Sequence, residues 1–160
     1  MVDSVRRAEA RDWSFVERAL TGAFGGTVAA GHDELIDVAD TDAVITELDG
    51  RPVGLLTYRD DNRGGWEVVT IVATEQGVGA GSALLDWVRD EARRHGARRL
   101  WLVTTNDNTH ALRFYQRRGF DLVRLDRGAV DRARVLKPSI PLENDGIPMR
   151  HELELELLLG

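Results

Sequence analysis

Apolar residues recur along the chain with two periods, and each change of period marks an expected element. Short apolar, β-branched runs predict strands over residues 2–8, 43–48, 52–58, 66–73, 99–105 and 120–125. Apolar positions three or four apart predict helices over residues 13–24, 84–95 and 108–118. Residues 27–42 show no clear period, and we expect a second short helix within them, around residues 33–39.

Turn and capping residues separate these elements. Asp49-Gly50 is typical of a tight hairpin turn, so residues 43–73 are expected to form three antiparallel strands. Asp12 or Ser14 is expected to cap the first helix, and Gly96 ends a later one. The order is strand, two helices, three strands, helix, strand, helix, strand. It predicts an α/β fold with a mixed, mostly antiparallel central sheet flanked by helices.

The tail is expected to add a short helix over residues 129–136, a loop over residues 137–148 and a terminal strand over residues 149–159. Alternation along that strand places three glutamates on one face, Glu152, Glu154 and Glu156, opposite a face that carries His151 and leucines. The glutamates are either a solvated row or an electronegative wall that attracts a cation.

Composition limits the function classes. A chain of 160 residues fits one domain spanning residues 1–160. Its net charge of −6 disfavours nucleic acid and anionic membranes as partners. The absence of cysteine excludes disulfides, thiolate metal sites and a cysteine nucleophile. No signal-peptide pattern and no apolar run of about 20 residues occurs, so we expect a cytoplasmic protein.

A glycine-rich turn carries the strongest chemical signal. Gln76-Gly77-Val78-Gly79-Ala80-Gly81-Ser82 lies between an expected strand and an amphipathic helix. Free amide groups at such a helix start bind phosphate without a basic side chain. The lysine of a nucleotide-hydrolysing loop is missing after Gly81, and the glycine spacing differs from that of dinucleotide-binding folds. A glycine turn that only relieves crowding remains the alternative.

The run from Asn108 to Phe120 is the second informative segment. Asn108 is a helix cap, and Gly119 ends the helix. Ala111 and Tyr115 lie four residues apart on one helix face, where the small side chain leaves room and the tyrosine projects a hydroxyl. Taken alone, every residue of this run is also explained by helix formation.

Together the two segments resemble motifs of the GNAT superfamily of N-acetyltransferases. The first motif is matched by Gln76, Gly79 and Gly81, and the second by Asn108, Ala111, Phe114, Tyr115, Gly119 and Phe120. The resemblance covers roughly residues 2–125, and the proline-rich tail looks like a feature of uncharacterised bacterial members. One departure is Ala73-Thr74-Glu75, where the family often carries proline and an aromatic residue.

The resemblance implies acetyl-CoA as co-substrate, no metal, and direct transfer to an amine. It implies that the pantetheine arm pairs with Ile71, Val72 and Ala73, that residues 76–82 hold the pyrophosphate with help from the Ser82 hydroxyl, and that Asn108 and Ala111 contact the arm. Tyr115 would protonate the departing thiolate. Glu67 would be the base, directly or through a water. His32, His110 and His151 are expected to be surface or packed residues.

The acceptor is expected to be a small-molecule or peptide amine, chosen by residues 21–40 and 126–148. A catalytically silent module that binds acyl-CoA as a sensor or structural partner is the alternative from another class, and a donor other than acetyl is a third. A homodimer is conceivable if the leucine-rich final strand pairs across a two-fold axis.

Overall fold

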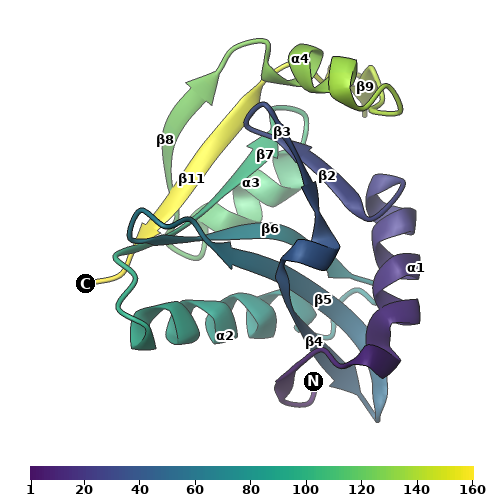
Figure 1. Cartoon of the computed structure of the whole chain (residues 1–160), viewed down its shortest axis with the longest axis vertical. Coiled ribbons are helices and arrows are strands. Elements are labelled where there is room, and N and C mark those ends of the chain that lie inside the picture. Colours follow the sequence, from purple (N-terminus) through teal and green to yellow (C-terminus); the bar gives the residue numbers. More distant parts are fainter.

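A seven-stranded sheet organises the computed structural model, which describes residues 1–160 (Figure 1). Its strands run in the order β1-β4-β5-β6-β7-β11-β8. They span β1 Val5–Arg7, β4 Asp42–Leu48, β5 Arg51–Asp60, β6 Gly65–Ala73, β7 Arg99–Thr105, β8 Asp121–Asp126 and β11 Glu152–Leu158. The helices are α1 Trp13–Phe24, α2 Ala80–Arg94, α3 Thr109–Gln116 and α4 Ala129–Leu136. The predicted α/β fold with a mixed, mostly antiparallel sheet flanked by helices is confirmed.

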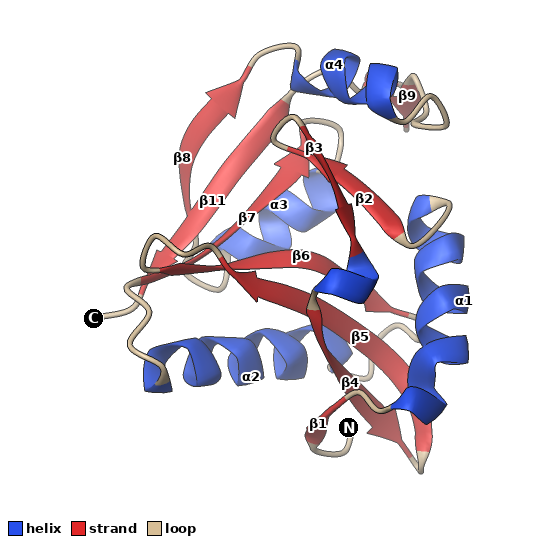
Figure 2. Ribbon diagram, in the orientation of Figure 1, coloured by secondary structure: helices blue, strands red, loops and turns tan.

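Alternation along the strands builds a core on each face of the sheet. Val44 and Leu56 point to the face covered by α2 and α3, where they join a cluster of 16 buried residues. Their neighbours Ile45 and Leu55 point to the face covered by α1, where they join a cluster of six. Figure 2 shows α1 and α2 on opposite sides of the strands. None of the helices is long and apolar enough to cross a membrane.

The strands β4, β5 and β6 form the predicted meander. Asp49 and Gly50 both have positive φ, 52° and 78°, as a two-residue hairpin turn of this type requires. The register between β5 and β6 shifts between Thr57 and Tyr58, which leaves Val69 as the extra residue of a bulge in β6. A bulge of this kind bends a strand and re-aims its side chains.

The only parallel contact in the sheet is short. β6 pairs with β7 over three residues, from Gly65 to Glu67 against Arg99 to Trp101. Beyond Glu67, β6 remains paired with β5 but has no partner on the side that faces β7. The two central strands therefore diverge and leave an opening in the middle of the sheet.

The short helix expected around residues 33–39 was a wrong prediction. Residues 28–37 form a hairpin instead, with strands β2 Val28–Gly31 and β3 Glu34–Asp37, followed by a single 3-10 turn at Val38–Asp40. His32 and Asp33 form its turn with φ of 34° and 66°. The alanines of this segment and its turn without glycine do not indicate strands in the sequence. The burial of Ile36 and Val38 against the sheet decides the conformation instead.

Three further expectations need correction. The final strand β11 lies between β7 and β8, so both of its edges are used and it has no free edge for pairing across a two-fold axis. The loop over residues 137–148 contains a short hairpin, β9 Glu143–Asn144 and β10 Ile147–Pro148. Asp12 occupies the N-cap position of α1, but its carboxylate binds Arg6 and makes no cap hydrogen bond to the helix.

Truncating the centre of β11 should destabilise the whole sheet. Leu155 is fully buried between β7 and β8, so Leu155→Ala should lower the free energy of unfolding by about 3 kcal/mol. Urea denaturation followed by circular dichroism measures the change. Leu158→Ala is the matched control, because Leu158 ends the same strand with 66% of its surface exposed and should change stability by less than about 0.5 kcal/mol. Equal effects of the two substitutions would contradict the central position of β11.

Candidate functional site

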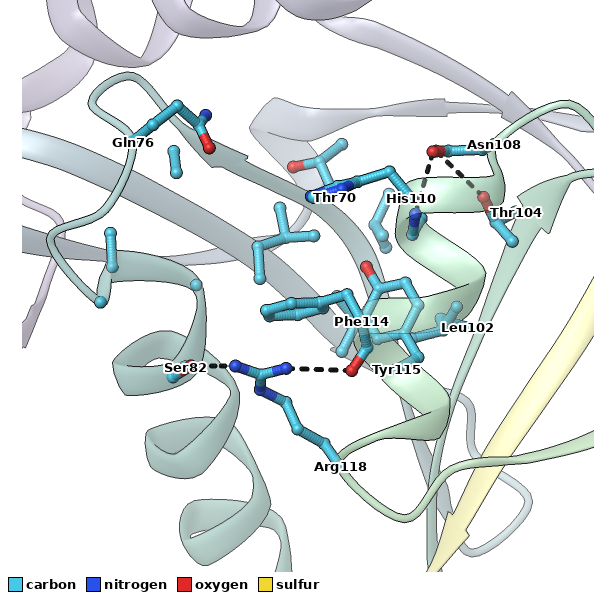
Figure 3. A pocket seen from close by; sticks show the side chains of 18 of the residues that line it. Thr70, Gln76, Ser82, Leu102, Thr104, Asn108, His110, Phe114, Tyr115 and Arg118 are labelled. Atoms are coloured by element: carbon cyan, nitrogen blue, oxygen red, sulfur yellow. Dashed lines mark hydrogen bonds between the residues drawn. The ribbon is translucent and has the colours of Figure 1, made fainter.

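The opening between β6 and β7 continues as a groove of about 470 Å³ between α2 and α3 (Figure 3). Its walls come from the second half of β6, the glycine-rich turn, the start of α2, the end of β7 and one face of α3. Nine residues beyond β6 were expected to bind a cofactor, and all but Val78 line the groove: Gln76, Gly77, Gly79, Ala80, Gly81, Ser82, Asn108 and Ala111.

The glycine-rich turn presents free amide groups to this groove. Gly77 and Gly79 have φ of 78° and 81°, a backbone conformation that glycine adopts at little cost. The amide N–H groups of residues 77–82 donate no hydrogen bond within the protein, because the helical bonds of α2 begin with later donors. Such a row of donors at the positive end of a helix is suited to an anion of the phosphate type.

Gly81 allows α2 to pack closely against Phe114 of α3. A Cβ at this position would lie 3.0 Å from Cζ of Phe114. Arg118 covers a face of the phenyl ring, with its guanidinium carbon 3.7 Å from the ring centroid, and it donates a hydrogen bond to Ser82 Oγ. Arg118 has no carboxylate partner, so the groove carries one free guanidinium beside the free amides.

Asn108 holds the start of α3, as predicted. Its Oδ1 accepts a hydrogen bond of 3.2 Å from the amide of Ala111, and its Nδ2 donates one of 3.4 Å to Thr104 Oγ1 (Figure 3). This cap fixes the first turn of the helix that carries Tyr115 into the groove.

Tyr115 lies at the inner end of the groove and is 6% exposed. Its ring packs edge-on against Phe114 and also contacts Phe120. Its hydroxyl makes no hydrogen bond within the protein, and burial raises the pKa of the phenol well above its usual value. The group therefore stays protonated at neutral pH and can donate its proton only to a partner inside the groove.

Glu67 lies at a second, smaller cavity on the other side of the opening. This cavity has a volume of about 70 Å³ and shares four lining residues with the groove, Val68, Val69, Val103 and Thr104. Glu67 is 3% exposed, and both of its oxygens are engaged: Arg59 Nε lies 2.8 Å from one and His32 Nε2 lies 2.8 Å from the other. The predicted base is thus part of a three-residue network.

His32 is the functional candidate that the sequence did not indicate. It is the first turn residue of the β2–β3 hairpin, and its ring lies between Glu67 and Trp101, 5.6 Å from the indole centroid. The hydrogen bond to Glu67 is the main cause that raises the pKa of His32, against an opposing effect of burial. Because the contact joins residues 35 positions apart, no local spacing in the sequence could reveal it.

The structure brings most of the predicted site residues together. Two of them lie outside the groove, and the two predicted catalytic residues lie at different cavities. Ile71 and Ala73 line the groove, but Val72 points to the opposite face and packs against the α1 core. Val78 does not line the groove either. Tyr115 and Glu67 lie at different cavities that meet at the same opening. Nowhere in the chain are three His, Asp or Glu side chains arranged to hold a metal ion.

Comparisons with known proteins agree on one family. The model of the acetyltransferase (GNAT) family matches residues 7–120. The uncharacterised protein YxbD of Bacillus subtilis is 43% identical over 108 residues, which are 67% of each chain.

Two solved structures share the fold over nearly the full length. An IAA acetyltransferase from Bacillus cereus has a TM-score of 0.79 at 20% identity, with 99% of this chain and all of that chain covered. A Bacillus subtilis acetyltransferase, crystallised in complex with CoA, has a TM-score of 0.76 at 18% identity, with both chains fully covered. At these identities the two structures establish a common fold.

The pairing of His32 with Glu67 should appear in the titration of the ring. NMR of the imidazole should give a pKa above about 6.5, and Glu67→Gln should lower it by removing the carboxylate partner. Since the folded-state pKa is raised, the ion pair stabilises the protein fully below about pH 6.5 and is lost as pH rises through the folded-state value. Glu34→Gln is the control and should have the smaller effect, because Glu34 Oε1 lies 3.4 Å from His32 Nδ1 and makes no hydrogen bond to it. An unchanged pKa in Glu67→Gln would contradict the pairing.

Proposed function

The chain belongs to the acetyltransferase (GNAT) family, and on that premise we propose that it transfers an acetyl group from acetyl-CoA directly to a primary amine. One observation carries the proposal. The groove with its free amides and the His32–Glu67 cavity meet at a single opening between β6 and β7, so a donor and an acceptor can reach each other there.

The groove fits coenzyme A in shape and in chemistry. The unbonded amides of residues 77–82 would hold the pyrophosphate, and Arg118 would add a charge-assisted hydrogen bond to a phosphate oxygen. The unpaired edge of β6 offers backbone groups to the two amides of the pantetheine arm, next to Ile71 and Ala73. The similar Bacillus subtilis acetyltransferase, whose structure contains CoA, supports this assignment.

Acetyl-CoA supplies an activated thioester, which a neutral amine attacks but an ammonium group cannot. A lysine-type ammonium has a pKa of about 10.4, so the protein has to take up a proton. With Nε2 of His32 donating to Glu67, Nδ1 is the basic nitrogen that accepts this proton, and Glu34 Oε1, 3.4 Å from Nδ1, favours the protonated ring. Glu67 then acts through His32: it fixes the tautomer and stabilises the imidazolium, while Arg59 holds the carboxylate in place.

Tyr115 is suited to the opposite task at the leaving group. A phenol that burial keeps protonated, with no hydrogen-bond partner in the protein, can donate to a developing thiolate. Its position at the inner end of the groove, on the helix that Asn108 caps, places it on the cofactor side of the opening. His32 and Tyr115 therefore divide proton uptake and proton donation between the two cavities.

Binding of coenzyme A should depend on the glycine-rich turn. Isothermal titration should show micromolar binding of acetyl-CoA by the wild type and none by Gly79→Asp/Gly81→Asp, which adds two carboxylates, strains a left-handed backbone and crowds Phe114. Arg118→Ala should weaken binding roughly 10-fold by removing one charge-assisted hydrogen bond. Gly146→Asp is the control, a left-handed glycine in the β9–β10 turn that does not line the groove. Failure of the wild type to bind would overturn the proposed function.

Turnover should depend on both proton-transfer groups. With a panel of primary amines and detection of the released CoA thiol, Tyr115→Phe and His32→Gln should each lower kcat by about 10²-fold or more without loss of acetyl-CoA binding. Tyr58→Phe is the matched control, since the Tyr58 hydroxyl is buried and bound to Arg7 away from the groove. Tight acetyl-CoA binding without acetylation of any amine would instead favour the silent acyl-CoA-binding module.

A further inference from the structure

Glu152 is a buried carboxylate that forms no salt bridge with arginine or lysine. It begins β11, is 5% exposed, and lines the same small cavity as Glu67 and His32. One of its oxygens accepts a hydrogen bond of 3.0 Å from the backbone amide of His32. The other oxygen makes no hydrogen bond within the protein.

The other acidic side chains around Glu152 all form ion pairs with arginine. Glu152 differs from its neighbours in having no such partner. The carboxylates that surround the two cavities each bind a guanidinium group: Glu67 and Glu34 bind Arg59, Asp126 binds Arg132, and Glu154 binds Arg99. Within the glutamate row of β11, Glu156 also binds Arg99. Of the three glutamates in this row, only Glu152 has no ion pair with an arginine, although Arg124 lines a small adjoining pocket with it.

Burying a carboxylate without a cation is unfavourable, and here burial raises the pKa of Glu152. A positively charged group in the cavity would offset this cost by adding the missing ion pair. No arginine or lysine lines the cavity, and the only titratable cation there, His32, is already paired with Glu67. The arrangement therefore suits a cation that enters with a ligand.

The cavity itself limits the size of that ligand. On the hairpin side, the small residues Ala29, Ala30 and Gly31 line it together with His32 and Ile36. Its volume of about 70 Å³ is far below the roughly 300–1,000 Å³ of sites for larger ligands. It opens toward the groove through the shared residues Val68, Val69, Val103 and Thr104. A group bound at Glu152 would thus lie beside His32 and face the cofactor side.

We propose that Glu152 binds the ammonium group of the acceptor, and that the acceptor is a small alkylamine with no carboxylate next to its amino group. This inference rests on the proposed function and adds its substrate class. An acceptor carboxylate would be desolvated beside Glu152 and Glu67, and like charges at such short range are strongly unfavourable. Amino acids are therefore excluded as acceptors, and small aliphatic amines are favoured.

A binding experiment without turnover tests the proposal on the intact protein saturated with CoA. Propylammonium chloride should shift the backbone amide resonance of His32 and the indole resonance of Trp101 in a saturable manner. Propan-1-ol has nearly the same shape without the charge, and L-2-aminobutanoate is the same alkylamine with a carboxylate next to its amino group, so neither should cause saturable shifts. Equal binding of propan-1-ol, or no saturable shift with propylammonium, would overturn the proposal without recourse to any variant.

The substitution Glu152→Gln removes the negative charge of the side chain and keeps its hydrogen bond, so it separates an effect on ligand binding from an effect on folding. Glutamine keeps the acceptor oxygen for the His32 amide, so thermal stability should be equal to or higher than that of the wild type, while propylammonium should bind at least about 10-fold more weakly. Glu156→Gln is the matched control on the same strand and face, outside the cavity, and should bind propylammonium like the wild type. Unaltered propylammonium binding by Glu152→Gln would overturn the proposal.

Titration of CoA into the wild type and the same variants distinguishes failure of the Glu152 proposal from failure of the proposed function. If CoA binds normally but the binding of propylammonium does not depend on Glu152, only the proposed substrate class is wrong. If the wild type fails to bind CoA, the proposed function itself is wrong.

Discussion

The limited pairing of β6 with β7 is the constraint on which the rest of the structure depends. The two strands share only three residue pairs, from Gly65 to Glu67 against Arg99 to Trp101. The bulge at Val69 bends β6 just where the pairing ends. A fully paired sheet would bury the β6 edge in β7 and would join no groove to a second cavity. The interrupted sheet instead leaves the β6 edge and the free amides at the groove, and the buried carboxylates at the second cavity, on either side of one opening.

Residues 21–40 and 126–148, whose sequence predicted their structure least clearly, complete the second cavity together. The β2–β3 hairpin carries His32 over the sheet, and α4 from the tail supports it. Arg132 of α4 binds Asp33 at the hairpin turn, and Lys137 donates to the carbonyl oxygens of Phe24 and Val28 at its base. The tail thereby fixes the histidine that pairs with Glu67. Residues 21–40 and 126–148 form one wall, which is why neither segment is interpretable alone.

Charge pairing gives each cavity a distinct chemistry. On the cofactor side, the groups are free amides, one free guanidinium and a neutral phenol, all of which are donors suited to anions and to a leaving thiolate. On the other side, the groups are a histidine held by a carboxylate and one unneutralised glutamate, suited to a cation that must lose a proton. The donor groups therefore lie on the side of the thioester, and the basic and acidic groups lie on the side of the amine, as acetyl transfer to an amine requires.

The sequence by itself determined the mixed α/β fold, the meander, the glycine-rich turn and the capped helix carrying Tyr115, because turn residues, strand alternation and helix caps act over a few residues. It indicated Glu67 but not its network, and it suggested a helix where the β2–β3 hairpin lies. Only the tertiary structure decided that His32, Glu67 and Glu152 meet, since they come from three elements up to 120 positions apart. Side-chain charges are visible in a sequence, but which of them remain unpaired depends on packing.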